Sequence, residues 1–341
     1  MSALRQVWKT VKRNAGYGLA VTLRSAVAAL PPGARLSVGE RLGALAWRLA
    51  RRDRRRAIEH LGCAFSANGR SAAEIRNIGR ECFRNLGRCF AELCGLSRAG
   101  AGPRDVLALV DVTEGAERFR RLLAGGRGLV VVTAHLDNWE LSGASVACAG
   151  LPVVAVARRL YFEKYDRLIN GLRRHFGMEI VYQDESPRKL LRALRDGKLV
   201  ALLADQDVPR LDGAFVPFFG RPAYTPVGPA ALAVASGAEL VLAHTLREGR
   251  DRHRLLVSEP IQFDRSEKDR AVLEGTRGWC SLLEGTIREH PEQWVWMHRR
   301  WRTAPADRPE AARRSGIAVD AVSAPVLAAN GKWKLPGDGG H

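Results

Sequence analysis

The stretch that decides the fold is Gly128-Leu129-Val130-Val131-Val132-Thr133-Ala134-His135-Leu136-Asp137-Asn138-Trp139-Glu140. Its first half is a short apolar run that follows a turn rich in Gly and Arg, and its second half carries polar side chains. Such a run is typical of a strand in a parallel sheet that is covered on both faces. The sequence therefore predicts a buried strand over residues 129–133 with polar chemistry at its carboxyl end, where ligands bind in open α/β sheets.

His135 and Glu140 are the candidate catalytic residues. The small residues of segment 138–150 predict a helix that packs closely on the sheet, so His135 falls in the turn and Glu140 in the first helical turn. Residues five apart on a continuous helix point about 140° away from each other, so a direct contact needs the predicted break. A carboxylate on one imidazole nitrogen leaves the other free to act as a general base. Alternatively, His135 is a satisfied polar residue and Glu140 favours the helix N-terminus.

An alternation of strands and helices continues along the chain. This pattern predicts an α/β fold with a mainly parallel central sheet flanked by helices. Residues 71–96 have the spacing of an amphipathic helix, which Ser71 and Glu74 begin as a capping box. Further strands are expected at 106–111, 152–157, 178–182, 199–204, 240–246 and 254–258, and further helices at 118–123, 161–176, 187–195 and 267–290.

Two of the predicted strands end in polar groups, as the central strand does. Arg158-Arg159 follows one strand, and Asp205-Gln206-Asp207 follows another. A guanidinium at this edge of the sheet can hold a phosphate or carboxylate in a bidentate manner. The carboxylates could orient that arginine, pair with His135 or bind a metal, and each group could also be an ordinary solvated strand end.

Three phenylalanines lie in an apolar segment, Phe215-Val216-Pro217-Phe218-Phe219-Gly220, which we expect to be a loop. Thr225 and Pro226 are the expected cap and first residue of a helix that runs to about Ser236. Three aromatic side chains are unusual on a free surface. Phe215, Phe218 and Phe219 therefore either line an apolar pocket or fill the core.

The net charge is +18, and it is concentrated at the N-terminus. Residues 1–60 hold thirteen Lys and Arg against three Asp and Glu, a net of +10. Predicted helices at 15–30 and 36–52 combine apolar faces with this charge, but sixteen residues fall short of the roughly 20 needed to span a bilayer. We expect shallow attachment to an anionic membrane, where each cation adds about 1 kcal/mol. The alternative is that both helices cap the domain and present a solvated face.

The domain organisation follows from these segments. We expect basic membrane-associating helices over residues 1–60, an α/β domain over 61–303 and a disordered, Ala/Pro/Gly-rich tail over 304–341. The six cysteines include no Cys-x-x-Cys pair, which indicates reduced thiols, and no cleavable signal peptide is evident. Phosphate-loop, dinucleotide, nucleophile-elbow and His-Glu-x-x-His zinc motifs are also absent from the sequence.

An ordered set of motifs resembles the bacterial late lipid A acyltransferases, which belong to the lysophospholipid acyltransferase superfamily. The similarity covers roughly residues 1–303 and includes the basic N-terminal helices. The motifs are His135-x-x-x-x-Glu140, Phe83-Arg84-Asn85-Leu86-Gly87-Arg88, Asp205-Gln206-Asp207 ahead of the segment 215–220, Pro291-Glu292-Gln293-Trp294 and Trp296-x-His298-Arg299-Arg300.

The resemblance implies an enzyme at the cytoplasmic face of the bacterial inner membrane. It would move a fatty acyl chain from acyl carrier protein or acyl-CoA onto a hydroxyl of an anionic glycolipid, a lipid A precursor, without a metal, a cofactor or an acyl-enzyme. By the same resemblance His135 is the general base and Glu140 its partner, while Arg158 and Asp205 lie near the reacting centre. Phe215, Phe218 and Phe219 would accommodate the acyl chain. Asp137 stands where the family pattern leads us to expect a small residue such as Gly.

Three other functions stay open at this point. The acceptor could be another glycolipid, such as a phosphatidylinositol mannoside. A noncatalytic basic protein would bind nucleic acid, a partner that the resemblance does not imply. A metal hydrolase would use His135, Asp137 and Asp205.

Overall fold

A seven-stranded sheet forms the centre of the molecule in the computed structural model, which describes residues 3–65, 69–321, 326–327 and 333–334. In spatial order the strands are β1 (Val110–Asp111), β9 (Arg252–Val257), β8 (Glu239–Glu248), β2 (Leu129–Thr133), β5 (Leu199–Leu203), β3 (Val153–Ala157) and β4 (Glu179–Tyr182). Strands β8, β2, β5, β3 and β4 run parallel, whereas β9 is antiparallel to β8 and parallel to β1. The predicted mainly parallel sheet is confirmed.

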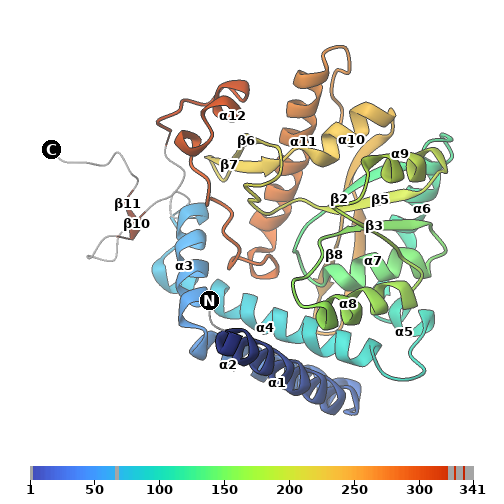
Figure 1. Cartoon of the computed structure of the whole chain (residues 1–341), viewed down its shortest axis with the longest axis vertical. Coiled ribbons are helices and arrows are strands. Elements are labelled where there is room, and N and C mark those ends of the chain that lie inside the picture. Colours follow the sequence, from blue (N-terminus) through green and yellow to red (C-terminus); the bar gives the residue numbers. More distant parts are fainter. Residues whose placement is uncertain (1–2, 66–68, 322–325, 328–332, 335–341) are drawn as a thin grey trace.

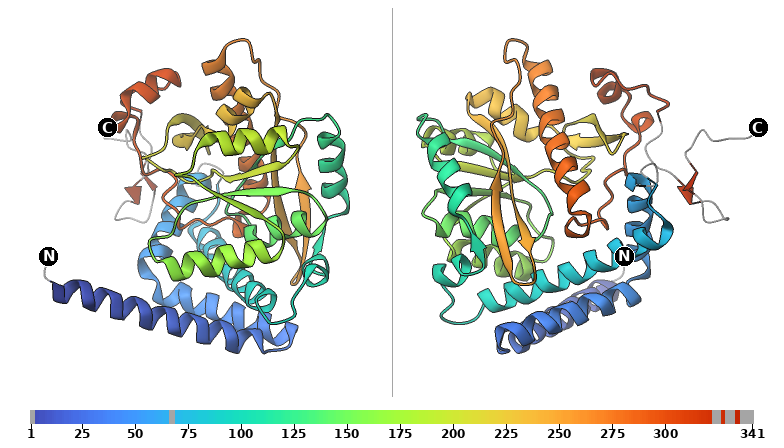
Figure 2. Two further views of the ribbon diagram at one scale, coloured as in Figure 1. Left: turned by 45° about the vertical axis from the view of Figure 1, so that its right-hand side comes forward. Right: turned by 180° about the vertical axis from the view of Figure 1, so that it is seen from behind.

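Helices cover both faces of this sheet (Figures 1 and 2). One face packs on α6 (Thr113–Leu123), α7 (Trp139–Cys148) and α8 (Glu163–His175), and the other on α9 (Pro187–Arg195), α10 (Gly228–Ser236) and α11 (Lys268–Glu289). Because side chains alternate along a strand, Leu129 and Val131 join the core cluster under α6, α7 and α8, and Val130 and Val132 join the core cluster under α9, α10 and α11. Strand β2 is therefore buried on both faces.

The N-terminal helices form a layer along one end of the domain (Figure 1). They are α1 (Ala3–Ala28), α2 (Pro32–Leu49), α3 (Arg51–Phe65) and α4 (Ala72–Leu96). The capping box of Ser71 and Glu74 begins α4 as predicted, whereas α1 starts earlier than expected and the predicted helix 36–52 is divided between α2 and α3. Among the described residues, no helix is both long and apolar enough to cross a bilayer.

A seam of glycines docks α2 closely on α4. A Cβ atom on Gly39 would lie 2.3 Å from the carbonyl oxygen of Gly87, and one on Gly43 would lie 2.2 Å from that of Phe83. Any side chain at these positions would push the two backbones apart. Helix α2 is therefore packed on the α/β domain along one side, which leaves its opposite side outward.

The segment 215–220 is a hairpin, so the predicted loop is wrong. Strands β6 (Gly213–Phe218) and β7 (Arg221–Pro226) pair antiparallel around Phe219 and Gly220, whose φ angles are 52° and 73°. Two left-handed residues are what a two-residue type I′ turn requires, and phenylalanine is a rare choice there. The expected helix cap therefore belongs to β7, and α10 begins at Gly228.

Two smaller predictions also differ from the structure. Segment 106–111 holds the end of α5 (Pro103–Leu107), a two-residue turn and the two residues of β1, so only its second half contains a strand. The segment from residue 304, expected to be disordered, forms η3 (Pro305–Asp307) and α12 (Pro309–Arg314), because Ala311 and Ala312 are buried against the β6–β7 hairpin. Beyond residue 321 the predicted tail lies outside the described residues, apart from β10 (Val326–Leu327) and β11 (Trp333–Lys334).

Candidate active site

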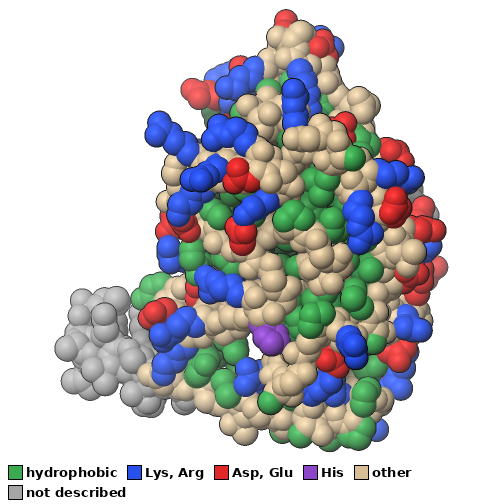
Figure 3. Space-filling model, turned by 90° about the vertical axis from the view of Figure 1, so that its right-hand side faces the viewer, with side chains coloured by type: hydrophobic (Ala, Val, Ile, Leu, Met, Phe, Trp, Pro, Cys, Tyr) green, Lys and Arg blue, Asp and Glu red, His purple; other side chains and the backbone are tan. Residues whose placement is uncertain are grey.

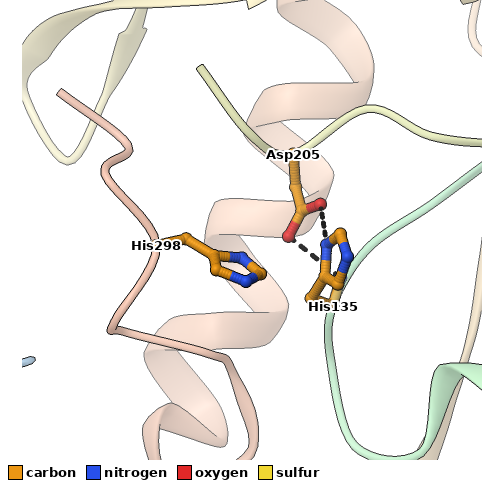
Figure 4. Close-up of side chains that lie close together, drawn as sticks. All are labelled: His135, Asp205 and His298. Atoms are coloured by element: carbon orange, nitrogen blue, oxygen red, sulfur yellow. Dashed lines mark hydrogen bonds and ion pairs between the residues drawn. The ribbon is translucent and has the colours of Figure 1, made fainter. Parts of the chain in front are cut away.

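His135 and Asp205 form a hydrogen-bonded pair where the carboxyl ends of β2 and β5 meet (Figure 4). The Nδ1 atom of His135 lies 2.7 Å from Oδ1 of Asp205, and the backbone N–H of His135 donates to Oδ2 at 2.9 Å. Since a carboxylate accepts, Nδ1 carries the proton and Nε2 keeps its lone pair. Among the described residues Nε2 has no carboxylate partner, and only the amide nitrogen of Gln206, at 3.2 Å, lies beside it, so a substrate hydroxyl that displaces this amide could give its proton to Nε2.

Asp205 is fully buried and has its carboxylate oxygens engaged. Oδ2 also accepts a hydrogen bond from the indole Nε1 of Trp294 at 2.9 Å. Burial alone would raise the pKa of Asp205, but His135, His298 and the hydrogen bond from Trp294 outweigh it and hold the pKa below its usual value. The Asp205 side chain is therefore ionised and fixed, as a group that orients an imidazole must be.

A second imidazole and an amide complete the cluster. The rings of His135 and His298 are perpendicular, with their centroids 4.5 Å apart, and the amide nitrogen of Gln206 lies 3.0–3.4 Å from the ring nitrogens of both. Burial and the neighbouring His135 lower the pKa of His298 to about 4, so its ring is neutral at pH 7. The sequence prediction gave no role to Gln206 or His298, although both lie in motifs that carry the resemblance.

A metal could be held by this cluster only after rearrangement. One ligand atom each from His135, Asp205 and His298 lie within 4.8 Å of one another. However, hydrogen bonds already occupy the Asp205 oxygens, and the Gln206 amide lies between the two rings. Asp137, which the metal-hydrolase alternative needs, binds His253 instead.

The expected contact between His135 and Glu140 is not formed. Glu140 accepts two hydrogen bonds from Arg173 on α8, at 2.6 Å from Nη2 and 2.8 Å from Nε. Helix α7 starts at Trp139, whose ring centroid lies 5.0 Å from that of His135, and Glu140 faces α8. Asp205 takes the place beside His135 that the sequence prediction gave to Glu140.

His135 lines one pocket, and another pocket lies next to it. A narrow apolar cavity of about 60 Å³ lies between the sheet and α7, lined by aliphatic side chains and by Trp139, Glu140 and Arg173. The second pocket, of about 280 Å³, is lined by His135, and it shares Trp139 and Arg173 with the first. Arg158 lines the second pocket, as expected for a residue near the reacting centre. A polar pocket thus continues into an apolar one beside the imidazole.

The three phenylalanines lie in the core and not in these pockets. Phe215 and Phe218 are fully buried and Phe219 is 6% exposed. Phe218 packs on Trp294 and Phe219 on Trp296, within the cluster on the α9–α11 side of the sheet. Of the two alternatives weighed from the sequence, filling of the core is the one that the structure supports, because both faces of the hairpin are covered: Phe215 packs with Ala311 and Ala312 of α12, and Phe218 and Phe219 pack in the larger cluster.

Two backbone hydrogen bonds to the segment 293–295 fix the turn that carries His135. The backbone N–H of Asp137 donates to the carbonyl of Gln293, and the N–H of Val295 donates to the carbonyl of His135. Asp137 has a φ angle of 47°, a left-handed conformation that costs a non-glycine residue roughly 1–2 kcal/mol. This conformation explains why a glycine is expected at this position.

The Asp137 carboxylate belongs to a buried tetrad with Glu92, Arg247 and His253. His253 bonds Asp137 through Nδ1 and Glu92 through Nε2, and Arg247 binds Glu92 through Nη1 and Nη2. Burial opposes the charge on His253, but its two carboxylate partners raise its pKa to about 9. Burial likewise opposes the charge on Glu92, yet His253 and Arg247 lower its pKa to about 2. Two anions and two cations therefore balance in the core.

One face of the molecule is visibly mixed in charge. On the face in Figure 3, Lys and Arg side chains are interspersed with Asp, Glu and apolar side chains. A nucleic-acid-binding face would instead gather its cations in a stripe or patch.

Together these features define a class of protein: an α/β protein whose mainly parallel sheet presents a His–Asp pair beside an apolar cavity. Residues 9–303 match the family described as bacterial lipid A biosynthesis acyltransferase. The chain belongs to this family, and the resemblance stated from the sequence is confirmed.

Named relatives fall into two groups by acceptor. The phosphatidylinositol mannoside acyltransferase of Mycobacterium tuberculosis (strain H37Rv) is 31% identical over 56% of this chain and 60% of the relative's length. The lipid A biosynthesis palmitoleoyltransferase of Escherichia coli (strain K12) is 27% identical over 79% of this chain and 85% of the relative. The lipid A biosynthesis myristoyltransferase of the same strain is 26% identical over 83% and 85%.

Proposed function

We propose that the protein is an O-acyltransferase that moves a fatty acyl chain from acyl carrier protein or acyl-CoA to a hydroxyl of a lipid A precursor or a related glycolipid. The observation that carries the proposal is the His135–Asp205 pair at a polar pocket that continues into an apolar cavity. The polar pocket suits the reacting groups, and the cavity suits a hydrocarbon chain.

His135 acts as the general base in this mechanism. Its Nε2 takes the proton of the acceptor hydroxyl while that oxygen attacks the thioester carbonyl. The tetrahedral intermediate then breaks its C–S bond, and the thiolate leaves with the proton that His135 returns. Such base catalysis contributes typically about 10²–10⁴-fold in rate. No acyl-enzyme is required, and Asp205 holds the imidazole in the reactive tautomer.

Glu140 acts through Arg173 in this proposal. The Arg173 guanidinium lines both pockets, and two hydrogen bonds from it to Glu140 fix its orientation. A cation placed at the junction can stabilise the oxyanion that develops on the thioester carbonyl. Arg158 lines the polar pocket, where it contributes to binding of the acceptor.

The acyl chain enters the cavity between the sheet and α7. Its lining is mostly aliphatic, and Gly143 of α7 allows Met178 to approach so closely that a Cβ on the glycine would lie 2.9 Å from the sulfur. At about 60 Å³ the cavity must widen to hold a long chain, since a cavity of about 150 Å³ takes benzene. Methionine is a flexible residue that can move to allow this.

Attachment to the cytoplasmic leaflet of the inner membrane completes the proposal. Leu19 and Leu23 on α1 and Leu45 and Leu49 on α2 are exposed, next to the arginines of the same helices. Apolar side chains of this kind insert shallowly while cations bind anionic lipid. Helix α1 also contacts the helix that supplies Arg173, because Tyr17 packs on Tyr165 of α8.

A phosphatidylinositol mannoside is the second candidate acceptor. The mycobacterial relatives that carry this name share 29–31% of aligned residues with the chain, slightly more than the lipid A enzymes share. Those alignments cover a smaller part of the chain.

Product mass tests the proposal most directly. Purified protein in detergent is incubated with acyl carrier protein loaded with chains of different length and with either a lipid A precursor or a phosphatidylinositol mannoside. The expected result is a glycolipid heavier by one acyl group with wild type and not with His135→Asn. Absence of acylated product from a folded wild-type protein with every donor and acceptor would contradict it.

A further inference from the structure

We propose that Arg158, Arg210, Arg299 and Arg302 form a phosphate-binding subsite beside the His135 pocket. This inference rests on the proposed transfer reaction and adds to it the chemistry by which one substrate is held. None of the comparisons assigns a role to these four residues.

The four arginines surround a pocket of about 360 Å³ next to the catalytic cluster. Gln206 and His298 form part of the same lining. Arg158, Gln206 and Arg210 also line the pocket that contains His135. The two pockets therefore share part of their lining, and an anion bound among the four arginines would lie next to the pocket that contains His135.

These guanidinium groups have no carboxylate partner within the described part of the chain, whereas two neighbouring arginines are held by other groups. Arg159 pairs with Asp184, and the buried Arg300 donates to Tyr224 and Thr225. Like charges gathered around one hollow repel each other, so the free protein is at a disadvantage that an anion removes.

Asp207 also lines this pocket but does not neutralise the arginines. Its two carboxylate oxygens accept hydrogen bonds from the backbone N–H and the hydroxyl of Thr303, at 2.7 and 2.8 Å. These bonds fix Asp207 against the chain that leads to Arg302, and one carboxylate does not balance four arginines. The charge of the pocket stays positive.

Phosphate is the ligand that suits this arrangement. The guanidinium group is planar and offers paired donors that match two phosphate oxygens. Two groups in the proposed reaction carry phosphate: the headgroup of the glycolipid acceptor, and the phosphodiester of the phosphopantetheine arm that carries the thioester. Either would be held with the reacting atom directed towards His135.

Steady-state kinetics with matched substrates test the subsite. The variant is Arg210→Gln/Arg302→Gln, and the control is Arg76→Gln/Arg80→Gln, which removes two exposed arginines of α4. Each protein is assayed with a phosphorylated acceptor and its dephosphorylated analogue, and with an acyl-phosphopantetheine donor and acyl-N-acetylcysteamine, which has no phosphate.

The expected result is a KM at least about tenfold higher for the variant with one phosphate-bearing substrate, and a kcat within about twofold of wild type. If the rise depends on the acceptor's phosphate, the subsite binds the lipid headgroup; if it depends on the donor's phosphate, it binds the phosphopantetheine arm. Unchanged KM values for all four substrates would overturn the proposal.

A binding measurement separates this inference from the proposed reaction. Detergent micelles that contain the phosphorylated glycolipid or its dephosphorylated analogue are titrated with each protein. Preference for the phosphorylated lipid in wild type and control, lost in the double variant, supports the subsite even if no transfer occurs. Transferase activity combined with unchanged KM and unchanged binding would leave the reaction standing and reject the subsite.

Discussion

Two histidines in this protein pair with carboxylates, and the surroundings give them different properties. The His135 side chain is 18% exposed and uses one ring nitrogen on Asp205, so the other opens onto a pocket. The His253 side chain is fully buried and uses both nitrogens, on Asp137 and Glu92. Of the two, only the His135 pair thus has a ring nitrogen without a carboxylate partner, as the proposed base catalysis requires, whereas both nitrogens of His253 are held by carboxylates in the core.

The largest expected effect is the loss of kcat when the His135–Asp205 pair is broken. Replacing His135 with Asn removes the base while an amide N–H can still donate towards Asp205. We expect kcat to fall about 10²–10⁴-fold, the usual contribution of a general base. The thermal midpoint should change little, and circular dichroism checks the fold. Near-wild-type turnover by the folded variant would mean that another group takes the hydroxyl proton.

The next largest effect is expected when one charge is removed from the buried tetrad around His253. Arg247→Met leaves Glu92 and Asp137 with only His253 as counter-charge in the core. Removing one partner of a buried ionic cluster costs about 3–5 kcal/mol, and urea unfolding measures this loss of unfolding free energy. Arg250→Met is the matched control, because Arg250 is half exposed and its ion pair with Glu40 is worth about 0–1 kcal/mol. Equal losses in the two variants would show that the tetrad has no special role.

A pH titration of stability sharpens the contrast further. The pKa of His253 rises to about 9 in the folded protein, where Asp137, Glu92 and Arg247 face its ring. Because the folded pKa exceeds the unfolded value of about 6.5, its stabilisation is complete below pH 6.5 and is lost as pH rises through 9. The loss amounts to about 3 kcal/mol. Urea unfolding between pH 6.5 and 8 measures the first part of this loss, below the range in which the cysteines titrate, and the slope in this window should become smaller in His253→Asn.

Three buried histidines provide an opposite signal at lower pH. Burial lowers the pKa values of His60, His244 and His298 to about 4, so these rings are neutral in the folded protein. Their folded pKa values lie below the unfolded value, so stability falls as pH drops from about 6.5 to 4. Their contribution lies at and below about pH 6.5, and burial raises the pKa of the cysteines above 9, so the window from pH 6.5 to 8 reports on His253. A stability that does not change above pH 6.5 would contradict the assignment of a charged His253.

Local patterns were sufficient to predict most of the fold. Strand β2 and helix α9 have the predicted bounds, because a Val-rich run between turns and a capped amphipathic segment each carry their own signal. The hairpin at Phe219 was missed, since its turn uses a residue that rarely adopts a left-handed φ. Local periodicity holds no information of that kind.

The site needed information that spacing along the chain does not contain. Strand polarity placed His135 and Asp205 at the same edge, but their contact depends on β5 lying directly beside β2, which is a matter of strand order. The tetrad was harder still to predict from the sequence, because it joins Glu92, Asp137, Arg247 and His253 from four different segments of the chain. The anomaly at Asp137 was visible in the sequence, whereas its partners were not.

The smallest expected effect tests which carboxylate serves His135. Glu140→Gln keeps an oxygen for Arg173 and leaves the His135–Asp205 bond in place, so kcat should fall by no more than about tenfold, which corresponds to about 1.4 kcal/mol from a weakened hydrogen bond. Asp205→Asn should cost more, because an amide in its place does not stabilise the imidazolium that forms during proton transfer. The measurement is the pH dependence of kcat for both variants. If Glu140→Gln instead shifts the profile as strongly as Asp205→Asn does, Glu140 reaches His135 during turnover and the pairing inferred from the sequence is the functional one.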